Sequence, residues 1–379
     1  MDIRFRRFAT WLSAAFIALS SQCCFAALYE ITHIDIGARF FPTAVNDNGV
    51  IVGHDGTLGG TSYVYDSNTG NVIDLQEFIP AGDIVALDIN NSSHVVGLHN
   101  RKANTAFAWN SLSGVSSIGT IGSDNYSVAT AINNQGQIVG FSSEANARPD
   151  HAFIFENNSI EEIILPFRGI ANGINDSGVV VGGSYEPVRS GFVWDSVNGA
   201  SILTPAFGAN AEALGINNSG EVIGWSGHRF GPAYPWQHAV MFDSGVSVDI
   251  DIPNNNFSRG TSINDAGMVV GFFRETSESL NGAFLFDGNA FLSLDSLIPS
   301  GTGWLLSIAE DINSSGQIVG YGTLNGEANA FLLTPVVEYG GVVSAPGSIF
   351  LIMAGTFALR IYGGWKEYSP TIYSSRHSG

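Results

Sequence analysis

Apolar and polar positions follow one another in a fixed order that recurs along the chain. One copy reads Ala131-Ile132-Asn133-Asn134-Gln135-Gly136-Gln137-Ile138-Val139-Gly140, in which two apolar pairs flank a short polar turn. The pattern occurs seven times, anchored on Asn46, Asn90, Asn133, Asn175, Asn217, Asn264 and Asn313, at spacings of 42 to 49 residues. A steady period of this length predicts a repeat architecture in which each copy is one supersecondary unit.

Each copy predicts four strands. In the third copy, residues 127–132 form a first strand, and residues 133–136 form a type I turn followed by a left-handed residue. The second strand ends on a glycine in every copy, which we interpret as room for the neighbouring unit. Ser93 replaces the turn glycine in the second copy, so a differently shaped turn is expected there.

In five of the seven copies the third strand is aromatic at alternate positions, as in Phe153 and Phe155, with an apolar residue between them. Alternate residues share one face of a strand, so this strand is apolar on both faces. Such a strand is covered on both sides, which predicts sheets stacked against one another. A further turn leads to a fourth strand, for example over residues 159–165.

The seventh copy lacks its fourth strand, because Pro335 and a different kind of segment follow residues 330–334. Residues 31–36, ahead of the first copy, match a fourth strand and its exit loop. Pairing these two segments would close a ring and remove the exposed sheet edges. The sequence therefore predicts an all-β, seven-bladed β-propeller of four-stranded blades closed by the N-terminal strand, with an open solenoid as the alternative.

The repeat resembles the HAF family of bacterial extracellular repeat proteins. The residues that carry this resemblance are the core of residues 131–140 and the Ala-Phe-Ala-Trp segment of residues 106–109. The resemblance covers about Leu28 to Thr334 and implies a secreted or surface-associated protein. It brings no established catalytic residues.

The chain ends predict two flanking segments around a propeller over residues 27–334. Residues 1–26 are typical of a secretory signal peptide: arginines, an apolar run from Phe8 to about Leu19, and Cys24 and Ala26 before the cleavage point. Adjacent Cys23 and Cys24 leave a lipoprotein as the alternative. Cleavage after Ala26 leaves no cysteine, hence no disulfide and no cysteine chemistry.

Residues 335–379 form a linker, a short hydrophobic segment and a polar tail. The apolar run from Ser348 to Leu359 has 12 residues, fewer than the roughly 20 of a membrane span. Together with residues 343–347 it is similar to a degenerate PEP-CTERM sorting signal. Sorting or envelope anchoring, a helix packed on the propeller, and a loosely held tail are the three alternatives.

Composition excludes one class of partner. The formal net charge is −19 at pH 7, and removing the signal peptide leaves 12 basic against 33 acidic residues. Such a surface repels phosphate backbones, so nucleic acid is not expected as a partner. No catalytic motif, metal-ligand spacing or phosphate-binding loop is present in the sequence, so no catalytic residue, metal or cofactor is predicted.

Basic residues are unevenly distributed over the predicted propeller. All nine fall in the second-to-third loops and the connections between blades, which open on one face, whereas the turns of the other face carry acids. Arginine favours carboxylate, sulfate or phosphate. Pairing with nearby loop acids is one interpretation. The other is a ligand site for an anion or sugar, whose candidate residues are Arg101, Arg148, Arg189, Arg229, Arg274, Trp225, Tyr234 and Trp236, the three aromatics serving as stacking surfaces on the long loop of residues 225–238.

The function hypothesis is a secreted or cell-surface, non-enzymatic binding module in a bacterium, with an anionic or carbohydrate ligand or a surface protein as partner. A hydrolase or lyase acting on acidic glycans at the arginine-bearing face is the alternative. A purely structural role in an envelope or matrix is a third.

Overall fold

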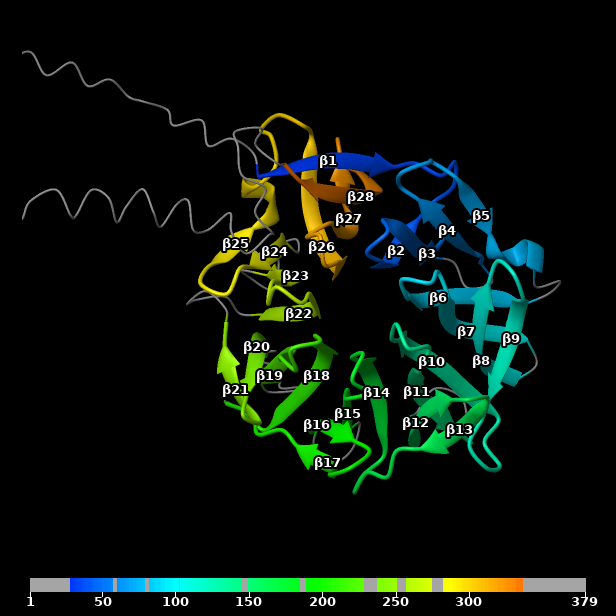
Figure 1. Ribbon diagram of the computed structural model, residues 1–379. Helices are drawn as coiled ribbons and strands as arrows, with labels where there is room; N and C mark the ends of the chain where they lie inside the picture. Colours follow the sequence, from blue (N-terminus) through cyan, green and yellow to red (C-terminus); the bar gives the residue numbers. More distant parts are fainter. Residues whose placement is uncertain are drawn as a thin grey trace, which may run out of the picture.

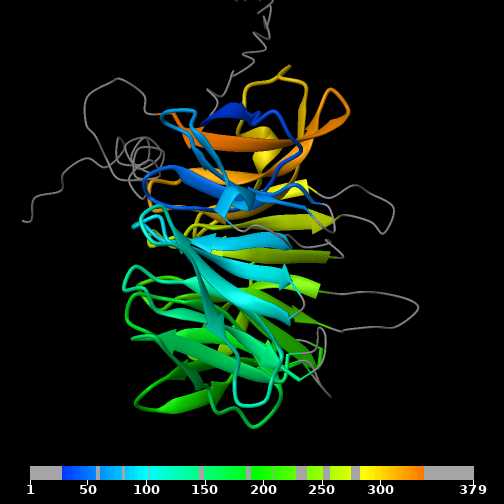
Figure 2. The same ribbon diagram turned by 90° about the vertical axis from the view of Figure 1, so that its right-hand side faces the viewer.

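The computed structural model describes residues 28–56, 60–78, 82–101, 103–144, 149–184, 189–206, 208–227, 237–250, 257–274 and 282–336. This part of the chain is almost entirely β-structure, with two short 3-10 helices, η1 (Leu75–Phe78) and η2 (Leu294–Ser296). Small antiparallel sheets stand side by side in a ring, each with its first strand toward the centre (Figure 1). From the side, the ring is a disc whose strands run between its two faces (Figure 2).

Three sheets come from the first half of the chain. The first contains β2 (Phe41–Val45), β3 (Val50–His54), β4 (Ser62–Asp66) and β5 (Val72–Asp74). The second contains β6 (Asp83–Ile89), β7 (Val95–Arg101), β8 (Ala103–Asn110) and β9 (Gly114–Gly119). The third contains β10 (Tyr126–Ile132), β11 (Ile138–Ser143), β12 (His151–Glu156) and β13 (Ser159–Glu162).

The second half continues the same order. One sheet contains β14 (Gly169–Ile174), β15 (Val180–Ser184), β16 (Gly191–Asp195) and β17 (Gly199–Ile202). An eight-stranded sheet follows, made of β18 (Asn210–Ile216), β19 (Val222–Gly227), β20 (Gln237–Asp243), β21 (Val246–Asp249), β22 (Phe257–Ile263), β23 (Val269–Arg274), β24 (Gly282–Phe286) and β25 (Phe291–Ser293). A single parallel pair, Gln237 with Phe257, joins its two four-stranded halves.

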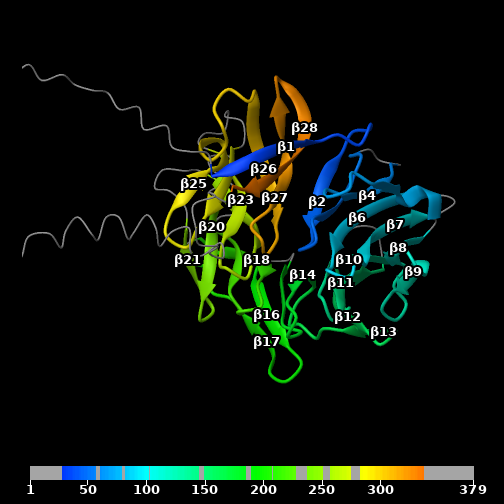
Figure 3. The same ribbon diagram turned by 45° about the horizontal axis from the view of Figure 1, so that its top comes forward.

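The N-terminal strand lies in the last sheet, as the sequence predicted. β1 (Tyr29–Ile34) pairs antiparallel with β28 (Glu327–Pro335), with Ile31 opposite Leu333, and β27 (Ile318–Leu324) and β26 (Trp304–Ile312) complete this sheet. Figure 3 shows β1 alongside β28. The predicted signal peptide and the C-terminal hydrophobic segment lie outside the described residues.

Every first strand contains a bulge. The register shifts by one residue around Thr43, Leu87, Thr130, Asn172, Leu214, Thr261 and Glu310, each three residues before the repeated asparagine. The bulge explains the closing glycine of the second strand. A Cβ on Gly140 would lie 1.9 Å from the carbonyl oxygen of Val128 in the same sheet, and the other six copies are equivalent. Our interpretation of this glycine as room for the neighbouring unit is therefore wrong.

The repeated asparagine has two roles. Within its own turn, Asn133 Oδ1 accepts hydrogen bonds from the backbone N–H groups of Gln135 and Gln137. Its Nδ2 donates to the carbonyl oxygen of Asn175 in the next repeat, at 2.9 Å. The same bond links each repeat to the next, and Asn313 donates to the carbonyl of Asn46 at 3.0 Å. The turn was predicted, but the circle of seven bonds between repeats was not.

The turn of the second copy has the same shape as the others. Ser93 adopts φ of +58°, and its N–H donates to the carbonyl of Asn90 at 2.9 Å, as the turn glycines do in the other copies. The expectation of a different turn is wrong: the serine is held in the left-handed region that normally favours glycine.

The apolar core is divided among the junctions between sheets. One cluster, for example, combines Val96 and Ala106 of the second sheet with Ala129 and Phe153 of the third. Each of the other five junctions between sheets has a cluster of its own, including the junction between the last sheet and the first, and one more cluster lies between the two halves of the eight-stranded sheet. Phe107, Phe153, Phe192 and Phe284, each the first aromatic of a third strand, are buried in these clusters, and Tyr63 is partly buried, which confirms the predicted packing between units.

Candidate functional site

Only part of the predicted ligand site can be placed. Arg189 precedes β16, Trp225 lies in β19, and Arg101 and Arg274 end β7 and β23. Neighbouring strands of a four-stranded unit are antiparallel, so the end of one strand and the start of the next lie on the same face of the disc. The face on which β7, β19 and β23 end is therefore also the face on which β16, β18, β20 and β22 begin. For Arg101 only the backbone is described. The remaining candidates, Arg148, Arg229, Tyr234 and Trp236, lie outside the described residues.

A polar cluster lies where β18, β19 and the start of β16 meet. Arg189 Nη1 donates to Glu212 Oε2 at 2.7 Å, and the indole N–H of Trp225 donates to the same oxygen at 3.2 Å. Asn172 Nδ2 donates to Glu212 Oε1 at 3.2 Å. The Glu212 side chain is only 7% exposed, so its charge is compensated by the nearby guanidinium and two further donors.

A second arginine, Arg259, reaches the cluster from β22, in the other half of the eight-stranded sheet. The guanidinium carbon of Arg259 lies 5.3 Å from the centroid of the Trp225 ring, and that of Arg189 lies 5.8 Å from it. Nε and Nη2 of Arg259 both donate to Gln237 Oε1, at 3.2 and 3.1 Å. We call Arg189, Glu212, Trp225, Gln237 and Arg259 the arginine cluster.

Two expectations about this site are wrong. Trp225 is fully buried, because β19 is covered along its whole length, so its ring is not a surface on which a sugar can stack. Arg259 lies inside β22 and not in a loop, so the nine basic residues do not all fall in loops. Of the described basic residues, Arg189 and Arg259 converge on one point, whereas Arg168 pairs with Asp150 at 3.1 Å.

Glu212, which the sequence interpretation missed, and Arg259 occupy the same position in two successive copies of the repeat. In all seven copies, the residue five before the repeated asparagine places its carbonyl against the closing glycine. This residue is apolar in five copies, as Phe41, Val85, Val128, Ile170 and Ile308, but it is Glu212 and Arg259 in the fifth and sixth. An alignment of the seven copies on their asparagines would have shown that charged residues replace apolar ones at this position in the fifth and sixth copies.

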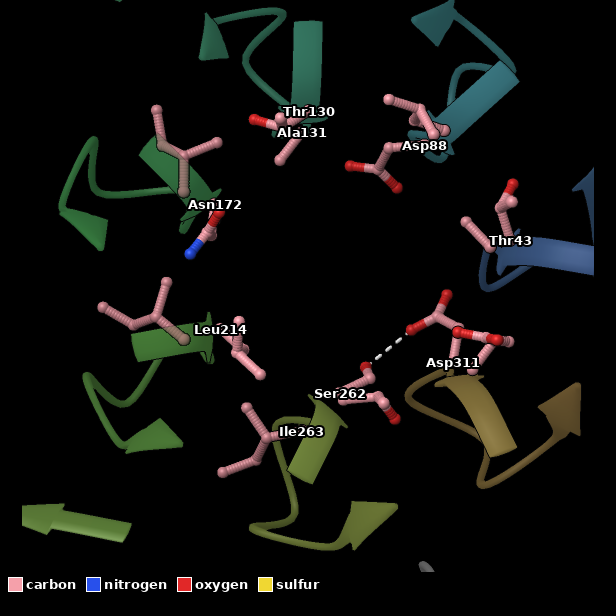
Figure 4. A pocket seen from close by; sticks show the side chains of 17 residues that line it. Thr43, Asp88, Thr130, Ala131, Asn172, Leu214, Ser262, Ile263 and Asp311 are labelled. Carbon is pink, nitrogen blue, oxygen red and sulfur yellow. Dashed lines mark hydrogen bonds between the residues drawn. The ribbon is translucent and has the colours of Figure 1, made fainter. Parts of the chain in front are cut away.

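A cavity of about 190 Å³ lies at the centre of the ring, lined by the bulged residues and their neighbours (Figure 4). Thr43, Thr130 and Thr261 each donate a hydroxyl hydrogen bond to a carbonyl of the next sheet, at 3.0, 2.6 and 2.7 Å. Asn172 makes the equivalent bond through its amide, at 2.8 Å. The bulges thus hold neighbouring sheets together around the cavity.

Three carboxyl groups lie along one side of this cavity. Asp88 and Asp311 accept backbone hydrogen bonds from the next sheet, from Ile132 and Val45, both at 2.8 Å. Burial, with the negative charge of Asp311, raises the pKa of Glu310 to about 7. Burial also raises the pKa of Asp88 to about 7, against the opposing effect of the Ile132 N–H. Leu214 lies across the cavity from Asp311 (Figure 4).

The described residues contain neither a candidate metal-binding group nor a candidate membrane-spanning helix. They contain no group of three or more histidine, cysteine, aspartate or glutamate residues placed to hold a metal ion. No helix in this part of the chain has the length and apolar character needed to cross a membrane.

Comparison with known proteins identifies the fold. No family model matches the sequence, and no curated protein matches it. Among solved structures, virginiamycin B lyase from Staphylococcus aureus superposes with a TM-score of 0.54 at 12% identity, covering 81% of this chain and 100% of the lyase. The β-propeller domain of the Trilobed protease from Pyrococcus furiosus, described as having an open velcro topology, gives 0.50 at 12% identity and covers 82% and 98%.

A third similar structure is YCF48 bound to a D1 peptide, with a TM-score of 0.51 at 10% identity, covering 83% of this chain and 96% of YCF48. At these identities the likeness concerns the fold and not the activity. The chain is an all-β protein with a β-propeller fold.

Proposed function

We propose that this protein is a closed seven-bladed propeller that acts as a secreted or cell-surface binding module, without enzymatic activity. Its ligand is anionic or a carbohydrate, or a surface protein that presents such a group. The resemblance of the repeat to the HAF family, the signal-peptide pattern and the sorting-like tail support this location. The pairing of β1 with β28 and the circle of seven asparagine bonds support closure.

The observation that carries the binding role is the convergence of Arg189 and Arg259 on Trp225. Two guanidinium groups from different sheets lie close to one aromatic ring, and the Glu212 carboxylate accepts a hydrogen bond from Arg189. Like charges brought together in a partly buried place cost free energy of folding, so an anionic ligand that binds between them offsets this cost. The fold alone does not require either arginine.

The alternative is a hydrolase or lyase that acts on acidic glycans at the same face, with Glu212, which is paired with Arg189, as its candidate carboxylate. Its burial and its pairing with Arg189 favour a structural role over acid–base catalysis. A glycan and peptide array, run beside an assay for released sugars or unsaturated products, tests both functions. Binding without turnover supports the binding module, whereas product formation supports the enzyme.

Variants connect these results to the site. We expect Arg189→Ala and Arg259→Ala to weaken binding on the array. Arg168→Ala, an exposed arginine outside the cluster, serves as the control and should bind as the unmodified protein does. Absence of both binding and turnover would favour a purely structural role in an envelope or matrix.

A further inference from the structure

We infer that the central cavity is a second binding site, for a small amino acid that carries one carboxylate and one ammonium group. The carboxylate accepts hydrogen bonds from backbone N–H groups of the fourth, fifth and sixth copies, and the ammonium group lies beside Glu310. The residues concerned are not those of the arginine cluster, and the inference does not rest on the binding role proposed for that cluster.

The residue before each repeated asparagine turns its backbone N–H toward the cavity. The asparagine and the residue four positions on form a hydrogen-bonded pair, so the N–H of the preceding residue points away from the partner strand. In the third copy, the N–H of Ile132 donates to Asp88 Oδ2 of the second copy at 2.8 Å. In the first copy, the N–H of Val45 donates to Asp311 Oδ2 of the seventh copy at 2.8 Å. Carboxylates are therefore the acceptors that the protein itself supplies to these N–H groups.

Three of the seven N–H groups have no such acceptor. Asp88 and Asp311 each accept two of them, one from their own copy and one from the next, and so serve four copies. The other three belong to Ile174, Ile216 and Ile263 in successive copies, and no hydrogen bond from them is found within the described residues. All three isoleucines line the cavity. An oxygen acceptor is expected there, because backbone N–H groups inside proteins are almost always paired.

A glycine leaves two of these N–H groups open to a ligand. The fourth copy has Gly173 where the second copy has Asp88 and the third has Ala131. A Cβ on Gly173 would lie 3.4 Å or more from its nearest neighbours, which is ordinary contact, so the packing does not require glycine. Glycine permits a close approach to the backbone. A ligand carboxylate can then take the place beside Ile174 and Ile216 that the Asp88 side chain takes in the second copy.

The other side of the cavity is acidic. Figure 4 places Asp88 and Asp311 across the cavity from Leu214, and Glu310 lines the cavity next to Asp311. No basic residue is among the described residues of the lining, and no hydrogen bond to the Glu310 carboxyl is found in the described part of the chain. Burial and the charge of Asp311 together raise the pKa of Glu310 to about 7. An ammonium group beside Glu310 offsets both effects and favours its ionised form.

Only a ligand with both charges fits both sides. A carboxylate without an ammonium group would face three acids across the cavity, and an ammonium group without a carboxylate would leave the three N–H groups unpaired. The cavity volume of about 190 Å³ is below the roughly 300 to 1,000 Å³ of drug-sized ligand sites, so the ligand is small. A small amino acid meets these requirements.

The ligand probes are L-alanine and β-alanine, two isomers that differ in the spacing of their charged groups. Propionate and ethylamine are the matched controls, because each isomer loses only its ammonium group in propionate and only its carboxylate in ethylamine. Titration calorimetry of the whole mature protein at pH 7 should show that at least one isomer binds more tightly than both controls, by on the order of 10-fold or more, since each control lacks one charge-assisted contact.

One variant tests the carboxylate side. Gly173→Asp supplies a carboxylate of the protein itself to the N–H groups of Ile174 and Ile216, as Asp88 does in the second copy, and should weaken binding of the preferred isomer by on the order of 10- to 100-fold. Gly173→Ala adds a methyl group without a charge and should weaken it less. Ser159→Asp adds the same charge at an exposed position of β13 and should leave the affinity unchanged.

A second variant tests the ammonium side. Glu310→Gln keeps the shape of the side chain but removes its charge, so it should weaken the preferred isomer and ethylamine but not propionate. Glu161→Gln, on the exposed strand β13, is its matched control and should change none of the affinities. This selective loss separates a contact with the ammonium group from a general loss of structure, which would weaken all the compounds together.

The inference is wrong if neither isomer binds more tightly than both controls. Ethylamine that binds as well as the isomers would indicate a simple cation site, propionate that does so would indicate a simple anion site, and no binding of any compound would leave the cavity a structural role. Glu310→Gln that weakens propionate as much as the isomers also overturns it. These criteria hold even if Gly173→Asp does not fold. None of them bears on the arginine cluster, whose binding the arrays measure.

Discussion

At the scale of single residues, the seven copies provide internal controls for one another. Six copies place glycine in the left-handed position of the first turn, and the second copy places Ser93 there at φ of +58°. The hydrogen bonds of the turn are the same in both cases. The asparagine, and not the glycine, therefore determines the shape of the turn.

Ser93→Gly should stabilise the protein. A non-glycine residue in the left-handed region costs about 1 to 2 kcal/mol of folding free energy, which glycine does not incur. The greater conformational freedom of glycine in the unfolded chain offsets part of this stabilisation. We expect the free energy of unfolding to increase by roughly 0.5 to 1 kcal/mol, measured by chemical denaturation. The converse change, Gly136→Ser in the third copy, should lower it by a similar amount. A loss of stability in Ser93→Gly would show that the serine side chain contributes something that the backbone does not reveal.

At the scale of the strand and turn, the side chain of the repeated asparagine joins each hairpin to the next one around the ring. Its oxygen caps the turn, and its amide nitrogen donates to the next repeat. The neighbouring position adds a second set of contacts. Asn134 Oδ1, for example, accepts the N–H of Asn91, while the N–H of Asn134 is accepted by Asp176.

Asn133→Asp tests the contact between repeats separately from the turn. The variant keeps an oxygen for the turn but replaces the donor nitrogen with an oxygen that faces the Asn175 carbonyl and Gln137 Oε1. We expect a loss of about 2 to 3 kcal/mol in the free energy of unfolding, because a buried acceptor meets other acceptors. Asn134→Ser, which copies Ser314 of the seventh repeat at this exposed position, should cost much less. Equal losses in the two variants would contradict a special role for the buried asparagine.

The sequence predicted the elements well because their signals are local. Turn residues, alternating aromatic residues and the missing fourth strand can each be recognised within about ten residues, and strand pairing followed from them. The bulge was missed because a period-two pattern assumes regular strands. Thr43 and its equivalents read as ordinary alternating residues, although their fixed distance from the asparagine could have identified them.

The site was predicted less well because it depends on which copies depart from the repeat. Arg189 was found from its charge, whereas Glu212 and Gln237 carry no local signal, and Arg259 was placed in a loop. Trp225 was expected to be exposed because aromatics near a loop suggest stacking, but it lies in a fully covered strand. Contacts between sheets are separated by tens of residues, and no local pattern specifies them.

At the scale of the whole molecule, the central cavity makes stability depend on pH. The folded-state pKa of Glu310 is raised to about 7 by burial and by Asp311, so the folded protein binds a proton more readily than the unfolded chain does. The stability from this group is fully present below its ordinary pKa of 4.5 and is lost as the pH rises through about 7. Asp88, raised to about 7, and Asp311, also raised by burial, act in the same direction.

Glu310→Gln should remove the contribution of this group. The variant should have a higher melting temperature than the unmodified protein at pH 8, and the difference should shrink as the pH falls and be nearly gone by about pH 4, where Glu310 is mostly protonated in both states. Melting temperatures measured from pH 4 to pH 9 give the comparison. Glu161→Gln, on the exposed outer strand β13, is the control and should follow the unmodified protein across this range. A constant difference at all pH values would exclude titration of Glu310 as the cause.

Closure of the ring is the property on which the other whole-molecule arguments depend, and a cross-link can test it. Glu30 and Thr334 are partners in the register of β1 and β28, so cysteines at both positions should form a disulfide without a change in the fold. The cross-link would close a loop of about three hundred residues and should raise the melting temperature, by a stabilisation on the order of 2 to 4 kcal/mol. Mass analysis of the mature chain, which is predicted to contain no other cysteine, detects the bond. Glu30→Cys combined with Glu327→Cys, at the far end of β28, is the control and should stay reduced. If the control pair oxidises as readily as the first, the N-terminal strand is not held in register, and the ring is open at that junction.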